Sequence, residues 1–233
     1  MKNTREELLR EASRVVGEQG VFALSMRKLA SSVGISPTAI YRHFQDKDEL
    51  ASQLVLESFR HFGSYLKDSE RSKKPLLRFR RIAQRYFDFS QEHENEYRLI
   101  FMTDRELLGF DRLDEDQVQE VSAPFEMLVE RVQECQDAGL FMAGEPRLLA
   151  AIAWSAFHGL ASLLMTGSLG VSNADAQKIA SFQMQRLEAS LLVPGVQVDA
   201  PQMKISSRPA GKKNRLDSDA GAQESRKTKG NQR

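Results

Sequence analysis

The sequence has almost no cysteine: Cys135 is the only one among 233 residues. A single thiol cannot form an internal disulfide, which argues against a small disulfide-stapled secreted protein. Neither sign of charge dominates, because 33 Lys and Arg stand against 32 Asp and Glu. With 41% hydrophobic residues the chain can bury a core, so a collagen-like chain or wholesale disorder is excluded.

The first residues, Met1–Glu7, are charged and no apolar run follows them. A secretory signal needs such a run, so we expect no signal peptide and a cytoplasmic protein. The sequence also lacks a Gly-rich phosphate loop, a G-x-S-x-G elbow and an H-E-x-x-H motif.

The four histidines show no close ligand spacing with one another or with the cysteine. They are His43, His61, His93 and His158. We therefore predict no enzyme activity, no cofactor and no metal site, and we interpret Cys135 as inert core.

Apolar residues recur at three- and four-residue steps, and alternating strand patterns are missing before residue 194. These features predict an all-α protein. Four N-terminal helices are expected. The first begins at a capping box formed by Thr4 and Glu7 and ends at Gly20, and the second runs from Ser25 to Gly34. The third begins at Ser36, with Pro37 in its first turn, and the fourth runs from a second capping box at 46–49 toward Leu66. Further helices are expected at 76–91, 117–138 with a kink at Pro124, 145–166 and 174–192, with a short apolar piece at 97–102 and a loop at 104–116.

Charge is unevenly distributed along the chain. Residues 201–233 hold nine Lys and Arg against three Asp and Glu, while residues 1–200 hold 24 against 29. Few apolar residues follow Pro194, so ordering this segment would not offset its entropy. We predict a DNA-binding domain at 1–50, a helical ligand-binding and dimerisation domain at 51–194, and a disordered basic tail at 195–233.

Two short predicted helices flank a Gly34-Ile35-Ser36 turn, which is typical of a helix-turn-helix. Ile40 and Phe44 are four residues apart and can pack against the preceding helix. The opposite face then carries Thr38, Tyr41 and Arg42. Residues 1–50 hold eight Lys and Arg against seven Asp and Glu, which favours a selective reader over a nonspecific basic coat.

This region resembles the TetR family of bacterial transcriptional regulators. The resemblance rests on Leu24–Ala30, on Gly34-Ile35-Ser36, on Ile40–Phe44 and on Lys47 with Leu50, and it covers about the first 60 residues. A weaker match, Trp154 to Gly159, resembles the Trp-x-x-x-His-Gly signature of one TetR subgroup's C-terminal domain.

The resemblance implies a set of DNA contacts at the second helix, the recognition helix and the start of the fourth helix. Phosphate contacts are expected from Ser25, Arg27, Tyr41, His43 and Lys47, and Arg27 can also reach a base. Base-edge contacts are expected from Pro37, Thr38 and Ala39, and Arg42 is expected near the groove wall. Taken singly, each of these residues is equally explained as surface packing or as a helix cap.

Residues 148–174 contain no charged side chain. A membrane span is disfavoured because the run contains His158 and serines and lacks flanking anchors. We predict a helix buried on two sides, and the family implies a homodimer through the last two helices. The candidate interface residues are Ile152, Leu160, Leu163, Ile179, Phe182 and Leu187, with Ala156 and Gly159 permitting close approach; an intramolecular core is the alternative.

Aromatic residues concentrate in the middle of the chain, and most are expected to be core. The resemblance implies that a subset lines an apolar ligand pocket. Our candidates are Phe59, Phe62, Tyr86, Phe89, Phe101, Phe125, Trp154 and His158. For His158, a buried histidine bonded to a neighbouring carbonyl is the alternative to ligand contact.

These patterns predict a homodimeric transcriptional repressor that a small apolar effector releases from a palindromic operator on double-stranded DNA. Two alternatives stay open: a helix-turn-helix protein without small-molecule input, and an activator. An enzyme on a helical scaffold is a more distant one, because no catalytic constellation supports it.

Overall fold

The computed structural model describes residues 3–205, and within them the chain is helical. The described residues form eight α-helices and five short 3-10 helices, with one isolated bridge between Phe141 and Leu192. The all-α prediction is confirmed. The α-helices are α1 (Thr4–Gln19), α2 (Met26–Val33), α3 (Lys47–Leu66), α4 (Pro75–Glu92), α5 (Glu94–Met102), α6 (Glu115–Asp137), α7 (Pro146–Met165) and α8 (Asn173–Leu191).

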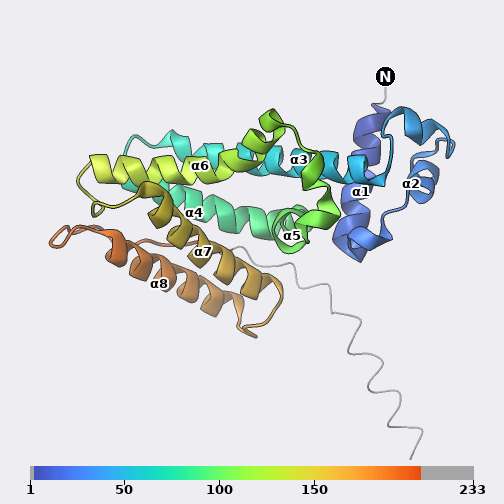
Figure 1. The fold of residues 1–233 in the computed structure, drawn as a ribbon. Helices are drawn as coiled ribbons and strands as arrows, with labels where there is room; N and C mark the ends of the chain where they lie inside the picture. Colours follow the sequence, from blue (N-terminus) through green and yellow to red (C-terminus); the bar gives the residue numbers. More distant parts are fainter. Residues whose placement is uncertain (1–2, 206–233) are drawn as a thin grey trace, which may run out of the picture.

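The helices form an elongated molecule with a small lobe at one end (Figure 1). We call the lobe of residues 3–46, which contains α1 and α2, the head. Helix α3 leaves the head and runs through the body, where it packs on α4, α5 and α6. Helices α7 and α8 pack on each other on the side of α4 away from α3 (Figure 1).

Capping residues set the starts of two helices as the sequence predicts. The carboxylate of Asp46 accepts a hydrogen bond from the backbone N–H of Glu49 at 2.8 Å, and α3 starts at the next residue. The hydroxyl of Ser25 accepts from the N–H of Lys28 at 3.5 Å and begins α2. The capping box predicted at Thr4 is wrong, because Thr4 is already helical and Asn3 precedes it.

The helix predicted from Ser36 is shorter and tighter than expected. Its regular part is the 3-10 helix η2, Ala39–Arg42. The carbonyl of Ile40 accepts from both His43 N–H, at 2.9 Å, and Phe44 N–H, at 3.1 Å. This shared acceptor mixes 3-10 and α geometry, so the segment does not extend into a long helix. We call residues 37–43 the reading segment.

The predicted loop at 104–116 contains two 3-10 turns, η4 (Arg105–Leu108) and η5 (Phe110–Arg112). Both turns contact α3, and we call residues 104–114 the bridging segment. Helix α6 continues through Pro124 over 23 residues. The remaining 3-10 turns are η1 (Val21–Ala23) and η3 (Lys67–Arg71).

The prediction that the chain is disordered from residue 195 is wrong for residues 195–205. Met203 is buried, and its N–H donates to the hydroxyl of Ser181 in α8 at 3.1 Å. Gln84 of α4 exchanges two hydrogen bonds with the backbone of Lys204. Three spaced apolar side chains, Val198, Met203 and Ile205, supply the packing that composition averages conceal. Most of the predicted basic tail, residues 206–233, lies outside the described residues.

Among the described helices, α7 is long and apolar enough to cross a membrane by length and composition alone. Core helices pass the same test. In the structure α7 packs against α4, α6 and α8, and its remaining surface exposes apolar side chains such as Ile152 and Leu163.

Candidate DNA interface and ligand cavity

The head places the two faces of the reading segment as the sequence predicts. Ile40 and Phe44 are fully buried and join Leu29 in the core. Gly34 makes the turn possible, since its φ of 80° lies in the left-handed region that other residues rarely adopt.

The opposite face of the reading segment is open to solvent. Pro37, Thr38 and Arg42 are exposed, and Tyr41 retains 55% of its accessible surface. Ala39 and His43 are partly buried. Donors, acceptors and small apolar groups thus share one accessible edge, as base and phosphate contacts require.

The other predicted DNA contacts lie at helix starts. Arg27 is exposed in the first turn of α2, while Ser25 and Lys47 are partly exposed. The Ser25 hydroxyl accepts the capping hydrogen bond of α2, so the helix-cap interpretation of this residue is confirmed. The structure places all nine predicted residues in the head or at the first residue of α3.

The start of α3 carries two aspartates that pair with one arginine. The guanidinium of Arg112, in the bridging segment, donates to both carboxylate oxygens of Asp46 at 2.9 and 2.8 Å and to Asp48 at 3.2 Å. These bonds hold the pKa of Asp46 below its usual value. Arg112 therefore offsets one of the two aspartate charges beside Lys47.

A partly open cavity of about 320 Å³ lies in the body. Its wall includes six of the eight predicted pocket residues. They are Phe59, Phe62, Tyr86, Phe101, Phe125 and Trp154. Phe62 and Phe101 meet edge to face with ring centroids 5.3 Å apart, an arrangement that aromatic pairs prefer.

Phe89 and His158 do not line this cavity. Phe89 is fully buried and packs behind Phe62, with ring centroids 4.9 Å apart. His158 Nδ1 is 2.9 Å from the Tyr86 hydroxyl and 2.8 Å from that of Tyr97. The histidine is therefore tied to two tyrosines behind the wall and not to a backbone carbonyl.

Burial keeps these three groups uncharged at neutral pH. It raises the pKa of Tyr86 well above its usual value of 10.0 and lowers that of His158 below 6.5. The two hydroxyl groups are 3.1 Å apart, and Ser162 lies within hydrogen-bond distance of both Tyr97 and His158, so the side chains form a connected hydrogen-bonded set. This set orients the Tyr86 ring in the cavity wall.

Sequence reasoning missed the charged part of the cavity wall. Arg147 donates to both carboxylate oxygens of Glu126 at 2.7 Å, and its guanidinium lies 5.5 Å from the Phe125 ring centroid. Arg105 lies over the ring of Phe110 at 4.2 Å. The arginines were missed because the pocket was predicted from aromatic residues alone. Phe110 was missed because the bridging segment has no apolar periodicity that would show which side chains point inward.

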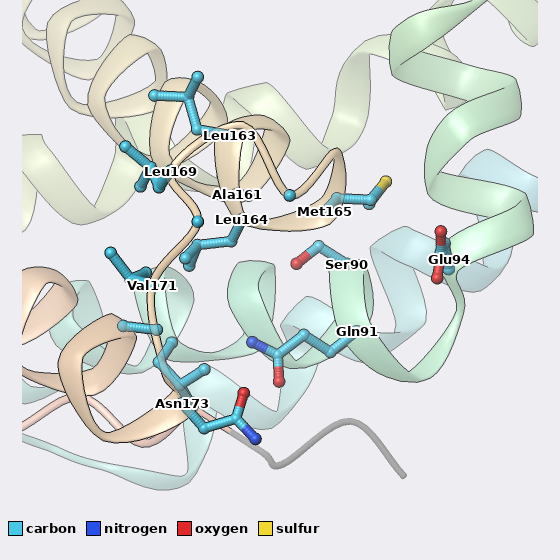
Figure 2. Close-up of a pocket in the computed structure, with 14 residues that line it drawn as sticks. Ser90, Gln91, Glu94, Ala161, Leu163, Leu164, Met165, Leu169, Val171 and Asn173 are labelled. Carbon is cyan, nitrogen blue, oxygen red and sulfur yellow. The ribbon is translucent and has the colours of Figure 1, made fainter. Parts of the chain in front are cut away.

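A second, smaller cavity of about 180 Å³ lies between the end of α4 and the α7–α8 turn (Figure 2). Ser90 and Gln91 form its polar side, and Leu164 and Val171 belong to its apolar side. Leu163 and Leu169 on its rim are exposed, so this cavity adjoins the apolar surface of the last two helices.

Helices α7 and α8 expose large apolar side chains. Ile152, Leu163 and Phe182 retain 55%, 43% and 64% of their surface. The prediction of an interface role is wrong for Leu160 and Leu187, which are buried in the core of the same chain. A Cβ at Gly159 would meet no atom within 4 Å, so this position is open on the chain's own surface.

Cys135 is fully buried in α6, and burial raises the pKa of its thiol to about 12. The thiol is therefore protonated at neutral pH, and a protonated, inaccessible thiol is unreactive.

A head with an exposed reading segment, attached to a helical body that contains an aromatic cavity, is typical of a helix-turn-helix DNA-binding regulator. Comparison with known proteins identifies its family. Residues 8–54 match the model for bacterial regulatory proteins of the tetR family, and residues 79–187 match that of the tetracyclin repressor-like C-terminal domain. Together the matches span well over half of the chain, and the chain belongs to the TetR family of DNA-binding transcriptional regulators.

Solved structures share this fold over most of the chain. A protein of unknown function from Rhodococcus sp. RHA1 is 25% identical, with a TM-score of 0.71 over 83% of this chain and 97% of that one. A TetR-family regulator from Pectobacterium atrosepticum is 23% identical, with a TM-score of 0.58 over 82% and 94%. The ketosteroid regulator KstR2 of Mycobacterium tuberculosis is 17% identical, with a TM-score of 0.59 over 83% and 97%.

Family membership confirms the predicted class, a transcription regulator that binds DNA and is not an enzyme. The family also supports dimerisation and operator binding.

The bridging segment approaches α3 closely at Gly109, which gives a stability prediction. Gly109 has a φ of 63°, and a Cβ there would lie 3.0 Å from the carbonyl oxygen of Asp48. Gly109→Ala should therefore lower the free energy of unfolding by about 2–3 kcal/mol, since backbone strain and a clash add. Urea denaturation measures the change.

Gly167→Ala is the matched control, because Gly167 has a φ of 70° but a Cβ added there would meet nothing within 4 Å. We expect about 1 kcal/mol from strain alone there. Equal losses at the two positions would contradict a close contact between the bridging segment and α3.

Proposed function

We propose that this regulator is a repressor, held on a palindromic operator by two heads and released when a small, largely apolar effector occupies the 320 Å³ cavity. The carrying observation is that one helix joins the two sites. Phe59 and Phe62 of α3 line the cavity, and Lys47 begins the same helix at the head.

In this proposal the reading segment enters the major groove. Thr38 contacts base edges together with Pro37 and Ala39, while Tyr41 and His43 bind phosphate. Arg42 and Arg27 lie close to the backbone and the groove. Ser25 and Lys47 add phosphate contacts at helix starts, where unpaired N–H groups favour anions. The exposure of Thr38 and Tyr41 supports these roles.

The effector acts by shifting a population of head orientations. A ligand that binds more tightly to a state with misaligned heads increases the population of that state. The size of the shift is set by the ratio of the ligand's affinities for the two states. The bridging segment gives a second connection, because Phe110 lines the cavity and Arg112 holds the carboxylates at the start of α3. A shift of this segment therefore reaches both the cavity wall and the DNA-facing end.

The two copies associate through the exposed apolar face of α7 and α8. Ile152, Leu163 and Phe182 supply apolar area, and Gly159 leaves room for close approach. Two-fold symmetry then presents the reading segments to major grooves one helical turn apart, about 34 Å. We place the domain boundaries near residues 50 and 194, and the protein in the cytoplasm with its DNA.

Removing the side chains of the reading edge tests DNA recognition. Thr38→Ala and Tyr41→Ala should each abolish specific operator retention, because each lost contact occurs twice in a dimer and costs about 1–3 kcal/mol per site. Operators are selected from a random DNA pool with the wild-type protein, and binding is measured by gel shift with random competitor.

Gln19→Ala is the control, since Gln19 is an exposed residue of the head outside the reading segment. Circular dichroism and sedimentation verify that each variant stays folded and dimeric. Undiminished operator binding by both reading-edge variants would overturn the DNA-contact proposal.

Effector binding can be followed by tryptophan fluorescence. Trp154 is the sole tryptophan and lines the cavity. An apolar compound that releases the operator should change Trp154 fluorescence and raise the melting temperature, because it binds the native state. Phe125→Ala should weaken that compound about tenfold, the scale of one lost aromatic contact.

Phe22→Ala applies the same substitution to an exposed residue of the head, outside the cavity wall, and should leave affinity unchanged. The compound panel includes members with and without a carboxylate, since Arg105 and Arg147 belong to the wall. If no member alters both fluorescence and operator binding, the alternative without small-molecule input is favoured. Reporter expression with and without the regulator separates a repressor from an activator.

A charge in the apolar face should separate the two copies. Phe182→Asp buries an unpaired carboxylate in the proposed interface, at a cost of about 3–5 kcal/mol, which weakens the dimer more than a hundredfold. Gln177→Asp is the control, because this exposed residue lies about 140° around α8 from Phe182. A Phe182→Asp variant that sediments as a tight dimer would refute this face.

A further inference from the structure

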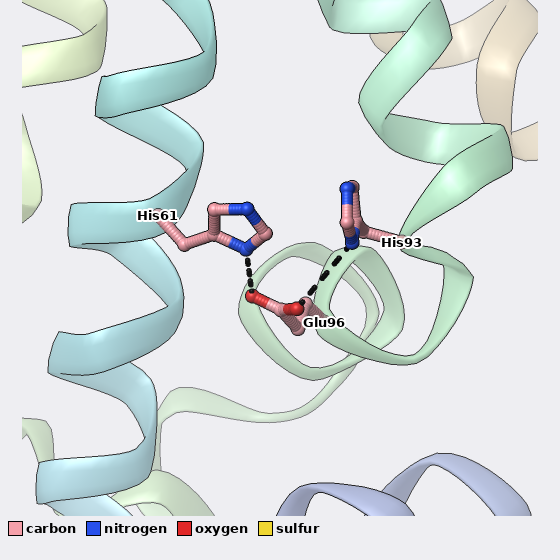
Figure 3. Close-up of side chains that lie close together, drawn as sticks. All are labelled: His61, His93 and Glu96. Carbon is pink, nitrogen blue, oxygen red and sulfur yellow. Dashed lines mark hydrogen bonds and ion pairs between the residues drawn. The ribbon is translucent and has the colours of Figure 1, made fainter. Parts of the chain in front are cut away.

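Three potential metal ligands from different parts of the chain come together on the body (Figure 3). His61 lies on α3, His93 lies between α4 and α5, and Glu96 lies in the first turn of α5. One ligand atom from each residue lies within 4.8 Å of the other two. The cluster is separate from the reading segment and from the wall of the 320 Å³ cavity.

The two imidazoles are directed at the same carboxylate. Nδ1 of His61 is 2.9 Å from one Glu96 oxygen, and Nδ1 of His93 is 3.7 Å from the other. The second distance is too long for a hydrogen bond, so the contacts within the cluster do not satisfy His93. The ring centroids of the two histidines are only 4.4 Å apart, which is unfavourable if both rings are protonated.

The surroundings hold the two rings in place. Phe89 packs against His61 with centroids 5.6 Å apart and against His93 at 5.2 Å. Tyr65 contacts both histidine rings, and its hydroxyl donates to the carboxylate of Glu92. All three candidate ligands are partly exposed, so an ion can enter from solvent.

The chemistry of the set fits a borderline-soft divalent cation. Two imidazole nitrogens and one carboxylate oxygen are a common zinc donor set, with water in the fourth position. Tetrahedral zinc with bonds of about 2.0–2.2 Å places its ligand atoms about 3.3–3.5 Å apart. Small side-chain rotations bring the present spacing to that value.

We propose that His61, His93 and Glu96 form a binding site for Zn²⁺, one ion per subunit, with its fourth position open to solvent. The ion links α3 to α5. Helix α5 packs on α1 of the head, where a Cβ at Gly17 would collide with Asn95. A bound ion therefore fixes the helix that supports the head relative to the helix that lines the cavity.

The test uses the full chain, free of any histidine tag and stripped with a chelator. Zn²⁺ is titrated against a competing chromophoric chelator, and Co²⁺ is added separately to read coordination from its visible spectrum. We expect one Zn²⁺ per subunit, a higher melting temperature with Zn²⁺, and the intense visible bands of four-coordinate Co²⁺ with nitrogen and oxygen ligands.

Each of three substitutions should weaken Zn²⁺ binding at least tenfold: His61→Gln, His93→Gln and Glu96→Gln. Loss of a residue that only hydrogen-bonds a metal ligand already costs about 10–100-fold in metal affinity, so loss of a ligand should cost at least as much. His43→Gln is the matched control and should bind Zn²⁺ like wild type. Glu96→Gln preserves side-chain volume, so it reports on the carboxylate even if a histidine variant folds poorly. Stoichiometric binding that survives all three substitutions, or no binding by the wild-type chain, overturns the proposal; neither result depends on DNA or effector binding.

Discussion

The continuity of α3 is the constraint on which the other features depend. Its 20 residues extend about 30 Å, from the Asp46 cap in the head to the far side of the body. Three residues of this one helix belong to three different sites. Lys47 lies at its start beside the head, Phe62 lies in the cavity wall, and His61 lies in the histidine cluster. Because an α-helix resists bending, movement of one segment of α3 is transmitted to the others.

The sequence was sufficient for features that depend on local patterns. The caps Ser25 and Asp46, the Gly34 turn and the buried pair Ile40 and Phe44 are short-range and appear as predicted. Six cavity residues were also found, because aromatic side chains on inward faces of several helices converge. Features formed by distant segments were missed: Met203 packs near Ser181, and Arg112 reaches Asp46 across 66 positions.

The errors share a physical cause. Apolar periodicity identifies the inward face of a helix but not which neighbour covers it, so Leu160 and Phe182 were both assigned to the dimer face although only Phe182 is exposed. The same holds for the cluster that we propose as a zinc site, where His93 and Glu96 are three residues apart at a helix start and spacing shows two of its three residues. Their third partner, His61, is brought by the packing of α3 against α5, which spacing along the chain does not reveal.

The Asp46 carboxylate makes two kinds of contact: it caps α3 and it accepts hydrogen bonds from the guanidinium of Arg112. A displacement of the bridging segment that withdraws the guanidinium would expose two negative charges, on Asp46 and Asp48, at the end of the molecule that we propose faces the nucleic acid. Coulombic repulsion from the sugar–phosphate strand would then reinforce the geometric misfit. In such an arrangement the affinity for DNA falls further as the bridging segment moves. Raising the ionic strength screens the repulsion and so reduces this additional loss of affinity.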